Sequence, residues 1–146
     1  MTTAPTTVLQ ARRAWSSLPA PDLASLEGRW EASFLAPLRT VAPRGLGLIG
    51  LPRWFGKKFT GNTGINLIHT TGGGLEETLP MRLGEDASWA DRRPVAVVSY
   101  AADAPRPWRW IRDEVRVLDA DTLLGMTFTD GPGVRRLGLP FLLRRS

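Results

Sequence analysis

The chain has 146 residues, a net charge of +5, a single histidine and no cysteine. Without cysteine there is no disulfide framework, no thiolate metal site and no cysteine nucleophile, and one histidine excludes sites built from several histidines. A hydrophobic content of 42% is that of a folded protein, and the length fits one domain. We therefore expect chemistry that uses carboxylates, hydroxyls, aromatic rings and the shape of a cavity, with no bound metal.

The positive charge is distributed unevenly, since residues 1–60 and 131–146 are basic and residues 61–130 are acidic. Basic proteins can bind nucleic acid or anionic membranes, but this chain has no run of five like charges. We expect these charges to solvate the surface, with no nucleic-acid partner. The first residues lack the apolar core of a secretory signal, and no segment has the apolar length of a spanning helix. The sequence thus predicts a cytoplasmic protein without a transmembrane segment or peripheral membrane contact.

Alternation of apolar and polar residues dominates the chain after a short N-terminal region. We expect residues 1–24 to form an arm with a helix over 8–16, and residues 25–146 to form a single domain. Period-two alternation predicts strands with one buried face, and clusters of glycine, aspartate and proline separate the runs. The expected strands cover residues 29–34, 65–69, 75–83, 94–101, 108–118, 122–129 and 139–144.

Residues 39–59 interrupt this rhythm with prolines, glycines, and mixed apolar and basic side chains. We expect an insert that covers one end of the fold, with a short helical turn from Pro52 toward Phe55. A loop that touches a membrane is the alternative. Residues 45–50 match the spacing of a dinucleotide-binding loop, but prolines flank them and no acidic residue occurs between Glu31 and Glu76. We therefore expect no cofactor.

About seven short strands without intervening helices are typical of an antiparallel sandwich or barrel. Four motifs, in order along the chain, favour the barrel. They are Gly28-Arg29-Trp30-Glu31-Ala32, Trp54-Phe55-Gly56-Lys57-Lys58-Phe59, the stretch from Asp113 to Met126, and Phe141-Leu142-Leu143-Arg144-Arg145.

Through these motifs residues 25–145 resemble the GXWXG family of lipocalin-like, calycin-type bacterial proteins. Ala32 stands where the family has its second glycine, and residues 60–107 match little of its pattern. The resemblance implies a closed antiparallel, lipocalin-like β-barrel with an interior cavity, with Trp30 packed across its floor. It also implies that a late arginine, Arg116 or Arg144, covers the Trp30 ring. It implies no settled activity.

Parity along the strands predicts which side chains line the interior. In the expected strand over residues 94–101, either Val95, Val97 and Ser99 or their neighbours Val98 and Tyr100 face inward. Glu77 and Asp113 share apolar faces, so each is expected to form an ion pair with an arginine, to be turned outward by a bulge, or to act on a ligand. Tyr100 joins them as a candidate acid or base. The candidate ligand-binding residues are Trp30, Phe34, Trp54, Phe55, Ile65, Leu67, Leu79, Met81, Val97, Ile111 and Asp113.

The leading hypothesis is that the barrel binds a small hydrophobic molecule in its interior. A second hypothesis is a cofactor-independent cyclase or isomerase that acts on a polyketide- or terpenoid-like substrate in the same cavity, with Glu77, Asp113 or Tyr100 moving protons. A third is an interaction protein whose basic segment, residues 39–58, docks onto an anionic partner.

Overall fold

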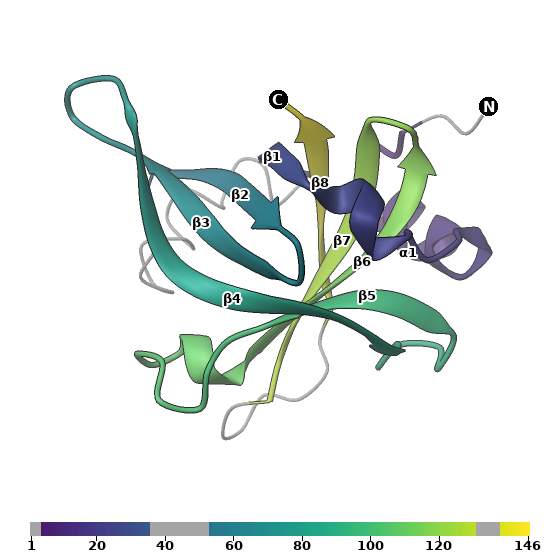
Figure 1. The fold of residues 1–146 in the computed structure, drawn as a ribbon. Helices are drawn as coiled ribbons and strands as arrows, with labels where there is room; N and C mark the ends of the chain where they lie inside the picture. Colours follow the sequence, from purple (N-terminus) through teal and green to yellow (C-terminus); the bar gives the residue numbers. More distant parts are fainter. Residues whose placement is uncertain (1–3, 36–52, 131–137) are drawn as a thin grey trace.

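The computed structural model describes residues 4–35, 53–130 and 138–146, which form a closed antiparallel β-barrel (Figure 1). Each strand pairs with its neighbour in the sequence, and the first pairs with the last to close the barrel. The predicted antiparallel barrel is therefore confirmed. Its strands are β1 (Gly28–Phe34), β2 (Trp54–Thr60), β3 (Thr63–His69), β4 (Leu75–Ala87), β5 (Pro94–Ser99), β6 (Ile111–Asp119), β7 (Thr122–Thr129) and β8 (Leu139–Arg145).

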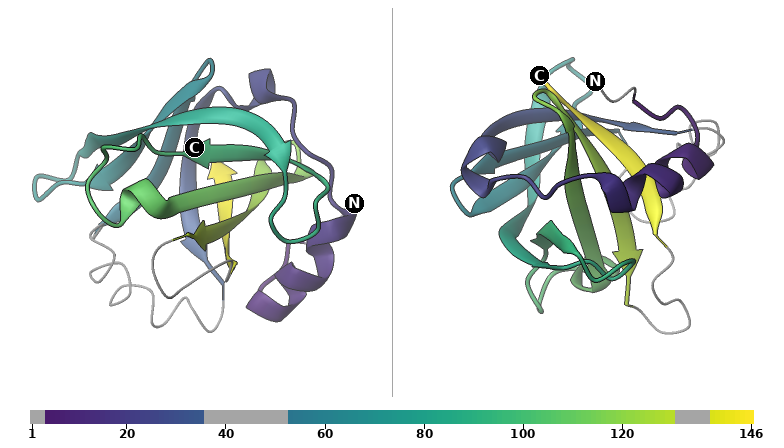
Figure 2. Two further views of the ribbon diagram at one scale, coloured as in Figure 1. Left: turned by 90° about the horizontal axis from the view of Figure 1, so that it is seen from below. Right: turned by 90° about the vertical axis from the view of Figure 1, so that its right-hand side faces the viewer.

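A short helix covers part of the outer wall. Helix α1 (Val8–Ala14) starts at Thr7, whose hydroxyl accepts a hydrogen bond from the Gln10 backbone N–H, and a 3₁₀ turn (Trp15–Ser17) continues it. It lies across the outside of the barrel beside β8 (Figure 2, right). Strands under the helix are buried on both faces, which gives one core inside the barrel and a second between helix and wall.

One end of the barrel is closed by Trp30. Its indole N–H donates to the Leu26 carbonyl at 2.8 Å, and the Arg145 guanidinium lies 4.2 Å from the ring centroid. The expectation that Arg116 or Arg144 covers this ring is wrong. Arg144 pairs with exposed Glu31, whereas Arg145 is directly opposite Trp30 and so shares its face.

The stretch predicted as the end of an insert is in fact a strand. Residues 54–59 belong to β2 and form no helical turn, while residues 39–52, the rest of the predicted lid, lie outside the described residues. A β-bulge between Trp54 and Gly56 adds one residue to this strand. A Cβ on Gly56 would lie 1.8 Å from the Trp30 carbonyl oxygen, so only glycine fits where β1 and β2 approach.

The run predicted as a strand over residues 108–118 begins with a 3₁₀ turn (Trp108–Trp110), and β6 starts only at Ile111. In a strand, strict alternation would place the indoles of Trp108 and Trp110 on one face, and the turn separates them. Trp108 is buried in the interior core, whereas Trp110 lines a groove on the outside. The alternation of residue types predicted a strand from residue 108, but a 3₁₀ turn has a period of three, so alternation does not identify it.

Candidate functional site

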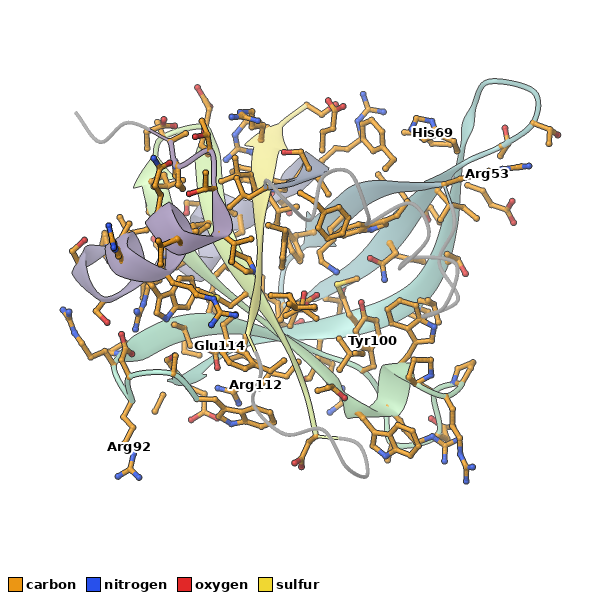
Figure 3. All side chains as sticks on the ribbon, turned by 180° about the vertical axis from the view of Figure 1, so that it is seen from behind. Arg53, His69, Arg92, Tyr100, Arg112 and Glu114 are labelled. Carbon is orange, nitrogen blue, oxygen red and sulfur yellow. The ribbon has the colours of Figure 1, made fainter. Side chains whose placement is uncertain are left out.

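A cavity of about 80 Å³ lies inside the barrel, toward the end away from Trp30. Its wall combines aromatic and aliphatic side chains with one compact polar cluster. Figure 3 shows Tyr100 among the side chains within the barrel, whereas His69 and Arg53 lie at the periphery. The described lining residues are Phe34, Trp54, Lys57, Asn66, Tyr100, Trp108, Ile111, Asp113, Thr127 and Leu139.

A buried ion pair forms the centre of the polar cluster. The Lys57 ammonium lies 2.9 Å from the Asp113 carboxylate, and both side chains are nearly inaccessible to solvent. Burial alone would lower the pKa of Lys57, but the charge of Asp113 and the hydrogen bonds to Asp113 and Tyr100 outweigh it and raise that pKa above its ordinary value. Lys57 therefore carries its positive charge inside the barrel.

Neutral polar groups complete the cluster around this pair. Lys57 Nζ also donates to Asn66 Oδ1 at 3.1 Å and to Tyr100 Oη at 3.3 Å. Thr127 Oγ1 donates to the other carboxylate oxygen of Asp113 at 2.8 Å. These bonds compensate the desolvation of both charges, as a buried pair requires.

Strand geometry explains how Lys57 and Trp54 reach the same cavity. They lie three positions apart, with two residues between them, so strict alternation would place them on opposite faces. The bulge between Trp54 and Gly56 shifts the parity and turns both inward, where Lys57 Nζ lies 5.4 Å from the Trp54 ring centroid. The Trp54 indole N–H in turn donates to Asn66 Oδ1 at 3.2 Å.

Sequence reasoning missed Lys57 and Asn66. Lys57 shares its parity with Phe59, an interior core residue, and that pattern could have identified it as facing inward. Asn66 carried the weaker signal, because it stands between apolar Ile65 and Leu67, which invites the opposite assignment. Only the pairing with β2 and β4 shows that the polar residue of this strand points into the barrel.

Eight of the candidate residues lie inside the barrel. Five of them (Phe34, Trp54, Tyr100, Ile111 and Asp113) line the cavity itself. Trp30, Leu79 and Met81 belong to the interior core, away from the cavity's described lining.

The predicted inward orientation of the other candidates is wrong. Val97 packs in the outer core beneath α1, and its neighbours Val98 and Tyr100 face inward instead. Phe55 lies edge-on to His69 outside the barrel, at 5.4 Å between ring centroids. Ile65 and Leu67 alternate with inward-facing Asn66 and so face outward.

Glu77 was expected beside Leu79 and Met81 but lies on the outer face. The β3–β4 register shifts between Ile65 and Asn66, which leaves Leu79 as an extra residue in β4 with a φ of 54°. The shift reverses the parity on its two sides, so Glu77 turns outward and forms an exposed ion pair with Lys58 at 2.9 Å. It is therefore remote from the cavity chemistry.

A second buried polar cluster lies between α1 and the barrel wall. The Arg116 guanidinium makes two hydrogen bonds to Asp91, at 2.7 and 2.8 Å, and stacks 4.6 Å from the Trp15 ring centroid. Hydrogen bonds from Arg116 hold the pKa of Asp91 far below its ordinary range. Beside it, Glu114 accepts hydrogen bonds from Ser88 and Arg112.

In residues 4–35, 53–130 and 138–146, no three histidine, aspartate or glutamate side chains gather where they could hold a metal ion. No helix there has the length and apolar character needed to cross a membrane.

Comparison with known proteins adds information on the fold. No protein-family model matches the sequence, and no curated protein sequence is similar to it. A solved structure described as a protein from Thermomonospora curvata is similar, with a TM-score of 0.70 and 20% sequence identity. The similarity covers 94% of this chain and 86% of that one. At this level of identity the two proteins share the barrel fold, and that is what the likeness establishes.

Proposed function

We propose that the barrel binds a small, largely apolar molecule in the cavity next to Lys57 and Asp113. The observation that carries this proposal is a buried, hydrogen-bonded polar network on one side of a cavity whose other side is aromatic and aliphatic. Small-molecule sites combine an apolar wall with a few convergent polar groups in this way.

The size of the cavity limits the ligand. Pockets for drug-sized molecules measure roughly 300–1,000 Å³, against about 80 Å³ here. The described cavity therefore suits a molecule of a few heavy atoms, or one end of a longer molecule. Phe34, Trp54 and Trp108 provide flat apolar surface for it.

The lipocalin-like GXWXG assignment remains part of this proposal. It is supported by the Gly28–Trp30 opening of β1 and by the arginine that covers the Trp30 ring from β8. A barrel of eight strands leaves room inside for side chains or for one small ligand. The proposed localisation is cytoplasmic.

A titration followed through the indole N–H signals of Trp54 and Trp108 tests the binding proposal. The probe is a branched alkene with no polar group. It has the six-carbon chain of methyl butyl ketone, with C=CH₂ in place of C=O. Ile111→Phe fills the cavity and is expected to abolish the shifts, because Ile111 lines it. The matched control, Ile65→Phe, places the same larger ring in an outer groove and is expected to leave them unchanged. If neither this alkene nor methyl butyl ketone shifts either indole signal of the unmodified protein, the binding proposal is wrong.

The alternative, a cofactor-independent cyclase or isomerase, is supported by the titratable groups that line the same cavity. Glu77 is outside, and burial raises the pKa of Tyr100, so at neutral pH the phenol remains protonated. Asp113 is then the candidate base and Tyr100 the candidate hydrogen-bond donor. Exchange of the protons next to the carbonyl of methyl butyl ketone in heavy water measures this chemistry. Acceleration by the protein that Asp113→Asn removes would establish catalysis.

A further inference from the structure

We propose that the ligand of this cavity carries an uncharged hydrogen-bond acceptor, such as a ketone or aldehyde carbonyl, and that the Tyr100 hydroxyl donates to it. This inference rests on the proposed function and specifies which ligands the site selects. It follows from the hydrogen-bond donors and acceptors around the Tyr100 hydroxyl.

The first step is the orientation of the Asn66 amide. Lys57 Nζ lies 3.1 Å from one amide atom, and a charged ammonium can only donate, so that atom must be the oxygen. The Trp54 indole N–H, which donates to the Gly56 carbonyl at 2.9 Å, also approaches this oxygen at 3.2 Å. The amide nitrogen therefore faces Tyr100 Oη at 2.8 Å and the Leu79 carbonyl at 3.4 Å. Asn66 thus donates to Tyr100 and cannot accept from it.

The second step concerns Lys57. Its three ammonium protons have three acceptors, which are Asp113 Oδ2, Asn66 Oδ1 and Tyr100 Oη. A charged ammonium has no lone pair, so Lys57 also cannot accept from Tyr100. Both neighbours of the phenol oxygen are therefore donors.

The third step is the phenol itself. Tyr100 Oη accepts two hydrogen bonds, and within the described part of the chain its own proton has no acceptor. The side chain is only 9% exposed and lines the cavity, so water reaches this donor poorly. A buried donor without an acceptor costs about 1–3 kcal/mol, and a ligand acceptor removes that cost.

The charge of the site determines that the acceptor is neutral. Lys57 and Asp113 are the only charged residues among the described lining residues, and at 2.9 Å they neutralise each other. A carboxylate would add a second negative charge close to Asp113 without a free cation to compensate it. The raised pKa of Tyr100, caused mainly by burial, keeps its proton available for donation at neutral pH.

The test compares three ligands of the same chain length: methyl butyl ketone, its methylene analogue in which C=CH₂ replaces C=O, and hexanoate. Each is titrated into the unmodified protein and into Tyr100→Phe, again through the indole signals of Trp54 and Trp108. The alkene leaves water more readily than the ketone, so the informative quantity is the change that the substitution causes for each ligand. We expect Tyr100→Phe to weaken the ketone about three- to tenfold and to change the alkene less than about twofold.

A second measurement needs only the unmodified protein, in case Tyr100→Phe does not fold. The carbonyl carbon resonance of the bound ketone is expected to shift downfield from its value in hydrocarbon solvent, as a hydrogen-bonded carbonyl does. A resonance at the hydrocarbon value overturns the inference, as does an equal effect of Tyr100→Phe on ketone and alkene. Hexanoate as the tightest ligand also overturns it, in favour of an anion site. In all three cases ligands still bind, whereas an absence of binding by every ligand rejects the proposed function as well.

Discussion

Two ion pairs among the described residues lie largely buried on opposite sides of the barrel wall, and they differ in what surrounds them. Arg116 and Asp91 lie between α1 and the barrel, where the guanidinium also donates to the carbonyls of Trp15, Arg93 and Pro94. Lys57 and Asp113 lie inside, on the wall of a cavity.

The difference shows how a structural pair can be distinguished from one that serves a site. The Arg116 guanidinium and the Asp91 carboxylate are both hydrogen-bonded within the protein, and these bonds attach the N-terminal arm to the barrel. The inner pair is equally well bonded, but its network leaves one donor, the Tyr100 hydroxyl, beside empty space. Both pairs join a cation to a carboxylate and are largely buried, with side-chain exposures of 2% and 5% for the inner pair and 1% and 16% for the outer pair, so the unused donor is the informative feature. Substitutions in the two ion pairs should therefore have different effects on stability and on binding.

Breaking the inner pair has the largest expected effect. Lys57→Met leaves the Asp113 carboxylate buried without a cation, which is expected to cost about 3–5 kcal/mol of unfolding free energy. The double variant Lys57→Met, Asp113→Leu removes both charges and is expected to recover most of that loss. Denaturant unfolding measures both. A double variant no more stable than the single one would mean that the pair itself stabilises the fold.

Arg116→Met is expected to cost about 2–4 kcal/mol, because Asp91 and the backbone carbonyls around Arg116 lose charged donors. Arg116 does not line the cavity, so binding of the alkene probe is expected to remain unchanged. Unfolding and the indole titration are measured on the same variant. Loss of probe binding by folded Arg116→Met would show that the two sides of the wall are coupled.

The outer pair also predicts a dependence of stability on pH. The pKa of Asp91 is lower in the folded protein than in the unfolded chain, so its contribution is present above pH of about 4 and is lost as the pH falls through the folded-state value. Asp91→Asn is expected to cost about 1–3 kcal/mol at neutral pH, a difference that shrinks under acid conditions. Unfolding measured from neutral to acid pH tests this. Asp103→Asn is the control, because Asp103 is exposed, and its profile should follow that of the unmodified protein.

The smallest expected effect is that of Glu77→Gln. The Lys58–Glu77 pair has side-chain exposures of 47% and 51%, and exposed pairs of this kind contribute less than about 0.5 kcal/mol. Unfolding free energy, probe binding and ketone proton exchange should all remain as in the unmodified protein. A clear loss of exchange activity would return Glu77 to the list of functional residues.

The sequence predicted the fold better than the site. Alternation identified most strands, including those that carry Phe34, Ile111 and Asp113 into the cavity. It failed for Glu77, Ile65 and Leu67 because period-two parity holds only in the absence of bulges and depends on a known register. For β5 the alternation left Val97 and Val98 as alternatives. Both faces of that strand are apolar, because one faces the barrel interior and the other packs in the outer core with α1.

The sequence by itself determined the class of structure. Short alternating strands without helices between them must pair as antiparallel neighbours, and Gly28 with Trp30 marks where the barrel begins. Only the tertiary structure decided which side chains form the site. The bulges at β2 and β4 change which residues face inward, and Lys57 meets Asp113 across the interior from a distant strand. The physical reason is that a charge is stable inside a barrel only beside its partner, and local periodicity carries no information on that partner.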